Sequence, residues 1–378
     1  MNTMGQKKPI VKKLIFVLLA VEITYLALFN VILSVPLTQT LVNQIKPDKF
    51  YVSWESAWTW YPFRIHIRDA SGNGQSRSQQ WEFDAGEVTA SIDLVPLIFK
   101  RVWIDDVIVR DASYQQRPRF KADKDYTQIV DFFPPISGRE MTRAVTTPKK
   151  KKRAWHVDID DIHLSGEFDY WIHQFRGRAK GSLEADLQVV SRGGPFSMTA
   201  PNVDLEFGPH YLNGTYELFR QGKLSGELGF APFVPRENKG IKLLKFVLLD
   251  VDISVDANSL SFIDVFTQNF NQMTVDGRGL VDGRLHMKKG RVLEGTKLSI
   301  DAKNIDVIVL SLNIEGQGAI DIGLGPETNG VLDLTVSYDG LLVTHEDDEE
   351  PLLKGRGLDF GMQGDGNLFR IEGEVDLS

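Results

Sequence analysis

Apolar and polar residues alternate along most of this chain, and this two-residue period constrains the fold more than any other feature. Alternation is typical of β-strands, whose successive side chains point to opposite faces of a sheet. The segment GSLEADLQVV at 181–190 is a long clean case, with Leu183, Leu187 and Val189 in alternate positions. Glycine, asparagine and aspartate separate such runs, as short turns require. The sequence therefore predicts a mainly β protein.

Helical patterns are few beyond the N-terminus. We expect one short helix in PLTQTLVNQIKP at 36–47, with Leu37, Leu41 and Ile45 on one side, and another at 259–270. Two short helices cannot cover a long sheet, so an apolar face must close on itself, pair with a second sheet or hold apolar ligands. We expect a long curled antiparallel sheet of roughly 18 to 20 strands that forms a groove, with a closed sandwich as the alternative.

An apolar run of 22 residues at 14–35 contains a single charge, Glu22, and follows four lysines. About 20 such residues form a helix that crosses a bilayer. A cleavable signal peptide is the alternative, but its apolar region is usually about 7–15 residues and precedes a small-residue cleavage site. The lysines predict a cytoplasmic N-terminus and a single membrane pass. The predicted anchor residues are Leu14, Ile15, Leu18, Val21, Ile23, Leu26, Leu28, Val31 and Ile32.

The charge balance and the absence of cysteine limit which compartment and which classes of partner we expect. Residues 36–378 carry 39 basic and 50 acidic residues, which argues against nucleic acid as a partner, because nucleic-acid-binding domains are usually basic. The chain contains no cysteine, and a secreted eukaryotic domain of this size would usually contain disulfides. We therefore expect a protein of the bacterial inner membrane with most of its chain in the periplasm.

Pro148 precedes five consecutive basic residues at 149–153. A nuclear signal would need cytoplasmic exposure, which the predicted anchor denies. We interpret 137–153 as a flexible surface loop that is solvated, attracted to anionic headgroups or docked to an acidic partner. It divides the chain into a cytoplasmic tail (1–13), a membrane helix (14–35), an N-terminal β cap (36–136), this loop, and a β-repeat groove domain (154–378).

Three G-x-G pairs recur at a period of 39 residues, at Gly277/Gly279, Gly316/Gly318 and Gly355/Gly357. None opens a convincing helix, so a dinucleotide-binding loop is a poor interpretation. We interpret the glycines as bulges or close approaches in a repeated strand unit that starts near residue 275. The third copy ends at Ser378, which we expect to reflect a truncated chain or a short protein whose last strand can pair with another chain.

The sequence predicts no catalytic, metal or cofactor site, and we do not expect an enzyme. Seven histidines are scattered without an H-x-x-x-H pair, and no G-x-S-x-G motif occurs. The acidic run HEDDEE at 345–350 lacks the ligand spacing of a calcium loop.

Several segments together resemble the AsmA-like family of Gram-negative envelope proteins, the TamB, YhdP and YdbH type. They are the lysine-flanked apolar run, YVSWESAWTWYPFRIHIRD at 51–69, LVPLIFKRVWIDDVIVRDASYQQR at 94–117, and the glycine-punctuated repeats. The resemblance implies a groove with an apolar inner face, and a role in phospholipid passage between membranes or in outer-membrane assembly. It also implies membrane and acyl chains as partners.

Two sets of residues are candidates for contact with lipid. Trp54, Trp58 and Trp60 concentrate aromatic surface shortly after the anchor, and we expect them to lie at the membrane interface or to plug the first end of the sheet. The candidates for the groove are apolar residues in alternating runs, namely Leu183, Leu187, Val189, Leu298, Ile300, Ile305, Val307, Val309, Leu332 and Leu334.

Two functions remain open. The first is a membrane-anchored groove that shields acyl chains during phospholipid transport. The second is an envelope assembly or scaffold factor that holds an outer-membrane or secretion partner by pairing at its C-terminal sheet edge, without lipid transfer of its own.

Overall fold

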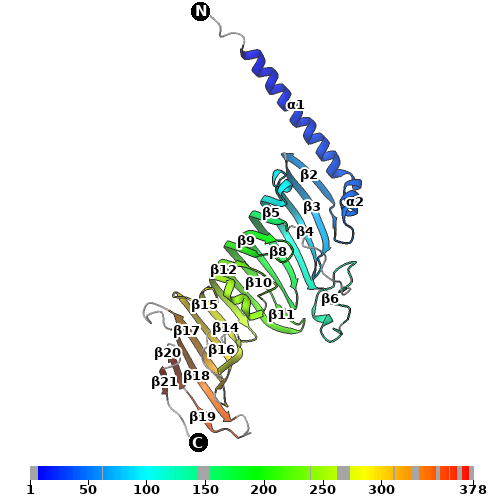
Figure 1. The fold of residues 1–378 in the computed structure, drawn as a ribbon. Helices are drawn as coiled ribbons and strands as arrows, with labels where there is room; N and C mark the ends of the chain where they lie inside the picture. Colours follow the sequence, from blue (N-terminus) through cyan, green and yellow to red (C-terminus); the bar gives the residue numbers. More distant parts are fainter. Residues whose placement is uncertain are drawn as a thin grey trace, which may run out of the picture.

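The computed structural model describes residues 7–61, 63–123, 125–143, 154–238, 240–261, 273–309, 311–324, 332–345, 350–356, 358–363 and 368–373. Figure 1 shows a long helix that projects from one end of an elongated, twisted sheet. The elements are α1 (Lys7–Ser34), α2 (Pro36–Ile45), β1 (Phe50–Ser53), β2 (Ser56–Tyr61), β3 (Arg64–Gln75), β4 (Gln79–Asp93), η1 (Val95–Phe99), β5 (Arg101–Pro118), β6 (Phe120–Lys121), η2 (Val130–Phe132), β7 (Thr142–Arg143), β8 (His156–Ile172), β9 (Phe175–Val190), β10 (Phe196–Phe207), β11 (His210–Leu212), β12 (Tyr216–Phe233), η3 (Gly240–Phe246), β13 (Val247–Ala257), β14 (Met273–Lys288), β15 (Arg291–Val292), β16 (Thr296–Val309), β17 (Leu312–Leu324), β18 (Leu332–His345), β19 (Leu353–Gly355), β20 (Leu358–Gln363) and β21 (Leu368–Gly373).

The apolar run forms α1, and its stretch Lys12–Ser34 is long and apolar enough to span a membrane. The helix ends before Val35, whose backbone is extended, with φ −82° and ψ 125°. Pro36 explains the break, because a proline disfavours helical geometry in the residue before it and is itself tolerated at a helix start. α2 is therefore a separate helix, and its predicted apolar side (Leu37, Leu41 and Ile45) is exposed.

Nineteen strands of the described chain join in one sheet, which confirms the predicted mainly β, curled-sheet fold. Consecutive strands pair antiparallel, from β3 to β4 and β5, and from β8 through to β21. The one departure from the antiparallel expectation among the described pairs of this sheet is β5 with β8, which run parallel. A parallel pair needs a crossover connection, and residues 119–155 supply it.

The described part of this crossover packs against the end of β3, the start of β4 and the end of β5. Arg117 is buried and donates to the side chain of Gln80 and to the carbonyl of Pro134. Arg139 donates to Asn73, and Ser137 donates to Glu82. The pairing of β5 with β8 makes the sheet continuous across the predicted boundary between cap and repeat domain, so the domain division stays a prediction. The basic cluster at 149–153 and most of the predicted helix at 259–270 lie outside the described residues.

The glycines of the first two repeats lie at register shifts or close backbone approaches of the sheet, as predicted, whereas Gly357 of the third repeat lies outside the described residues. Gly277 and Gly318 have φ values of +137° and +158°, and register shifts follow Arg278 in β14 and Gln317 in β17. A Cβ atom at Gly277 would lie 2.2 Å from the carbonyl oxygen of Asn304 on the paired strand. Such a close backbone approach admits only glycine without strain.

Candidate functional site: the inner face of the sheet

β9 shows how the two faces of the sheet differ. Its odd-numbered residues from Gly177 to Val189 are small or apolar, whereas its even-numbered residues from Arg178 to Gln188 are charged or polar. The odd-numbered side chains share one face because side chains alternate along a strand. We call this face the inner face and the opposite one the outer face.

Two rows of paired residues continue the inner face across neighbouring strands, and we call them together the apolar track. Each residue of a row is the cross-strand partner of the next, so the side chains lie next to one another. All of them are half-buried except Val203, which is buried. The first row is Ile67, Val88, Val109, Leu164, Leu183 and Val203, and the second is Ile92, Ile104, Ile159, Leu187, Met198 and Phe230.

The groove candidates of β9 lie on this inner face. Leu183 and Leu187 belong to the apolar track, and Val189 pairs with Phe196 beside it. Leu183 also packs on a small buried cluster formed by Ala185, Ala200 and Val203. These three candidates retain exposed apolar surface that the chain's own side chains leave uncovered.

The candidates farther along the chain lie in a closed core. Leu298, Ile300, Ile305, Val307 and Leu334 are between 0 and 5 % exposed and belong to one hydrophobic cluster. This cluster draws on strands from β13 to β18 and includes residues on both sides of the β16 bulge. The sheet therefore closes around its own side chains here, and the five residues do not line an open groove. Val309 and Leu332 lie in β16 and β18, and their side chains are outside the described part.

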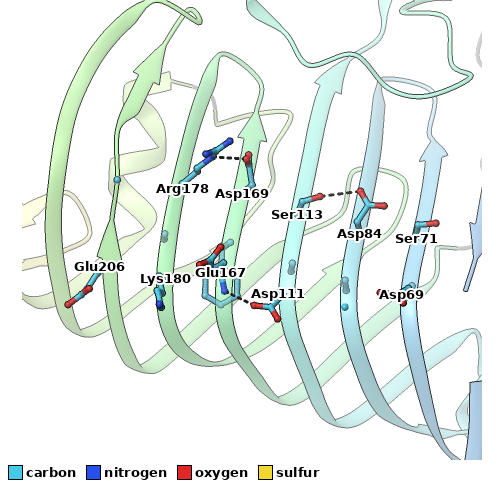
Figure 2. A pocket seen from close by; sticks show the side chains of 17 residues that line it. Asp69, Ser71, Asp84, Asp111, Ser113, Glu167, Asp169, Arg178, Lys180 and Glu206 are labelled. Atoms are coloured by element: carbon cyan, nitrogen blue, oxygen red, sulfur yellow. Dashed lines mark hydrogen bonds and ion pairs between the residues drawn. The ribbon is translucent and has the colours of Figure 1, made fainter. Parts of the chain in front are cut away.

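The outer face carries a hollow of about 760 Å³, in which charged side chains alternate with alanines (Figure 2). Arg178 donates to Asp169 at 3.0 Å, Ser113 donates to Asp84 at 3.2 Å, and the amide of Glu167 donates to Asp111 at 3.0 Å. Within the described ranges, no group of three or more histidine or acidic side chains is placed to hold a metal ion. These hydrogen bonds and charges suit a solvated face opposite the apolar track.

A buried histidine, His210, supports the inner face near the start of β9. A Cβ atom at Gly177 would lie 2.3 Å from the His210 ring, so the glycine makes room for it. Nδ1 of His210 lies 2.8 Å from the carbonyl oxygen of Gly208 and therefore donates to it, which leaves Nε2 to accept from the Tyr170 hydroxyl. Burial lowers the pKa of His210 and raises the pKa of Tyr170 to about 12. Both groups are therefore neutral near pH 7 and act in packing.

The helices cap the first edge of the sheet with side-chain amides. Asn43 of α2 accepts from the amide of Val52 and donates to its carbonyl, both at 2.8 Å. Asn30 of α1 makes the same pair with Thr59, at 2.9 and 2.8 Å. These amides replace the backbone partners that a further strand would provide to Val52 and Thr59. The sequence pattern did not reveal these contacts.

The three tryptophan candidates differ in their surroundings. The Trp54 indole donates to the carbonyl of Leu33 at 3.4 Å, so it packs beside α1. Trp58 stacks on His66, and the guanidinium of Arg68 lies over its ring. Trp60 is 76 % exposed. All predicted anchor residues except Leu26, which is half-buried, lie exposed on α1.

No family model and no curated protein matches the chain. The candidate site consequently rests on the geometry of the inner face. The sequence predicts a groove domain from residue 154 onward, and the apolar track also includes Ile67, Val88 and Val109 of the predicted cap.

Proposed function

We propose that this chain is a membrane-anchored, AsmA-like envelope protein whose apolar track shields phospholipid acyl chains during transfer between membranes. The observation that carries the proposal is that the inner face is partly exposed in one part of the sheet and fully buried in the other. The apolar track on β3 to β12 is half-buried, whereas the equivalent face on β13 to β18 is filled by its own core. An apolar face of this extent in water needs a cover.

Acyl chains fit this face chemically and in size. Each methylene group moved from water to an apolar surface contributes about 0.8 kcal/mol, so a lipid with two chains gains much from a continuous apolar surface. The seven strands from β3 to β12 that form the track span six strand spacings of about 4.8 Å, or roughly 29 Å. That length is close to the hydrocarbon thickness of a bilayer, about 30 Å. The headgroup would remain in water at the open side of the sheet.

The proposed orientation follows from the N-terminal lysines. They favour a cytoplasmic N-terminus, which puts the sheet in the periplasm if α1 crosses the inner membrane. α1 joins the sheet at β2, next to β3, where the apolar track begins. Lipid would therefore enter the track at its membrane end.

A photo-cross-linking experiment in cells tests this function. A photoreactive phenylalanine analogue replaces Leu187 on the inner face or, as the matched control, the neighbouring Gln188 on the outer face. Cells are grown with radioactive phosphate, and the full chain is purified under denaturing conditions after irradiation. We expect a phospholipid adduct at position 187 and none at position 188.

The other outcomes are equally informative. Adducts to protein without lipid at position 187 would refute lipid shielding and favour the scaffold alternative. Equal lipid labelling at both positions would show that lipid does not select the inner face. The absence of any adduct at position 187, with a folded chain in the membrane, would also contradict the proposal.

A further inference from the structure

Two neighbouring turns beside α1 expose a concentrated apolar surface, which we call the apolar tip. The turn between β2 and β3 exposes Trp60, Tyr61 and Phe63, and the segment that contains η1 exposes Leu94, Val95, Ile98 and Phe99. Ile98 is 79 % exposed and Phe99 is 67 % exposed. The two turns are adjacent, because the amide of Ile92 donates to the carbonyl of Phe63 at 3.0 Å. Large exposed apolar patches of this kind mark sites of contact with a partner or a membrane.

The apolar tip is attached to the middle of the apolar helix. The amide of Phe63 lies 3.4 Å from the hydroxyl of Tyr25, and the two rings pack with centroids 6.0 Å apart. Nearer the end of α1, Asn30 makes its two hydrogen bonds with Thr59. β2 therefore runs along the last part of α1 and points back toward the helix N-terminus.

This attachment fixes how deep the apolar tip lies when α1 spans a bilayer. Tyr25 precedes Ser34 by nine residues, which is about 13 Å at 1.5 Å per residue. The 23-residue span Lys12–Ser34 is about 34 Å long, only slightly more than a hydrocarbon core of about 30 Å. Tyr25, and with it Phe63, would then lie roughly 10 Å inside the hydrocarbon boundary.

The composition of the turns matches that depth. Six apolar residues, LVPLIF, lie between Asp93 and Lys100, so the charges stay at the base of the η1 segment. Exposed Trp103 lies just beyond, with the guanidinium of Arg101 over its ring. Tryptophan and arginine in this position are typical of a membrane–water interface. The β9–β10 turn at the same end of the sheet is instead polar, with Ser191 and Arg192.

We propose that the apolar tip penetrates the bilayer beside α1 and forms a second membrane contact of this protein. The inference rests on the membrane-spanning α1 of the proposed function. It adds that the sheet itself enters the hydrocarbon, so that Ile65 and Ile67, which follow Phe63 in β3, continue the bilayer interior into the apolar track. An acyl chain could then move from the leaflet to the track without crossing water.

Depth-dependent fluorescence quenching tests this contact. The chain contains no cysteine, so single cysteines can be introduced into the full chain and labelled with an environment-sensitive fluorophore. The test positions are Ile98→Cys and Phe99→Cys, with Leu19→Cys on α1 as the membrane control and Arg192→Cys as the water control. Each protein is reconstituted into vesicles of phosphatidylethanolamine and phosphatidylglycerol, with quenchers on the acyl chains or iodide in the water.

We expect the labels at positions 98, 99 and 19 to be quenched by the acyl-chain quencher and protected from iodide, and the label at position 192 to behave in the opposite way. Quenching by iodide at both 98 and 99, with position 19 protected, would overturn this inference and leave the anchor intact. Quenching by iodide at position 19 as well would refute the membrane span and with it the proposed function. Because positions 98 and 99 are exposed, cysteine there should not prevent folding, and the thermal unfolding of each variant checks this.

Discussion

Single residues of this protein show where a sequence pattern suffices and where it does not. Leu187 and Ile300 both occupy alternating strand positions, and the sequence correctly places both on a strand. Their burial differs, because Ile300 is 0 % exposed while Leu187 is half-buried. The local pattern determines which face a side chain joins, but the curling of distant strands determines whether that face is open or closed.

The glycine repeats could be interpreted from sequence because their cause is local. Gly279 lies at the register shift of β14, and a Cβ atom there would lie 2.4 Å from the carbonyl oxygen of Asp301 on the paired strand. Gly318, 39 residues later, lies at the register shift of β17, where a Cβ atom would lie 1.9 Å from the carbonyl oxygen of Ser337. A period of 39 residues therefore marks the bulges without any knowledge of the fold.

The first prediction concerns the backbone conformation of Gly277, whose φ is +137°. We expect Gly277→Ala to destabilise the sheet by about 1–3 kcal/mol, because alanine must adopt a disfavoured φ and its Cβ meets the Asn304 carbonyl. The matched control is Gly323→Ala in β17, where a Cβ would meet nothing within 4 Å. Urea denaturation of the full chain in detergent measures both. Equal midpoints for Gly277→Ala and Gly323→Ala would show that the bulge is not strained.

At the scale of elements, the contacts between the two helices and the first strands could not be predicted from the sequence. Asn43 and Val52 are nine residues apart, and Asn30 and Thr59 are 29 residues apart, on elements of different type. No periodic pattern links such a pair. Asn30 is a polar residue in the apolar α1, and only the structure shows that it binds the backbone of Thr59 in β2.

The second prediction tests the edge cap. Asn43→Ala removes both hydrogen bonds to Val52 and leaves its amide and carbonyl without those partners, which should cost about 1–3 kcal/mol. We expect faster amide hydrogen exchange in the peptide that contains Val52, while peptides of β16 and β17 keep their protection. Gln44→Ala, on the exposed side of the same helix, is the control and should leave the exchange of Val52 unchanged. Unchanged exchange in Asn43→Ala would mean that the cap contributes nothing to the edge.

At the scale of the molecule, the apolar surfaces follow one another in space from the anchor helix to the closed core. α1, the apolar tip and the apolar track follow one another, and the closed cluster of β13 to β18 comes last (Figure 1). The mainly β fold and the anchor could be predicted because each depends on local period and length. The division into an open and a closed part could not, because similar alternating strands form both parts.

The last prediction is that charged substitutions in the apolar tip reduce the loading of lipid onto the apolar track. The double substitution Ile98→Glu and Phe99→Glu places two carboxylates where hydrocarbon should lie, at a cost of a few kcal/mol each. If lipid enters through the apolar tip, the lipid adduct at position 187 should fall by at least about ten-fold, the effect of about 1.4 kcal/mol. Tyr216→Glu, an exposed aromatic at the opposite end of the sheet, is the control and should keep the adduct. Sedimentation with membranes checks that α1 still anchors both variants. A double variant that stays anchored, unfolds at the wild-type temperature and still gives the full adduct would show that lipid reaches the track by another route.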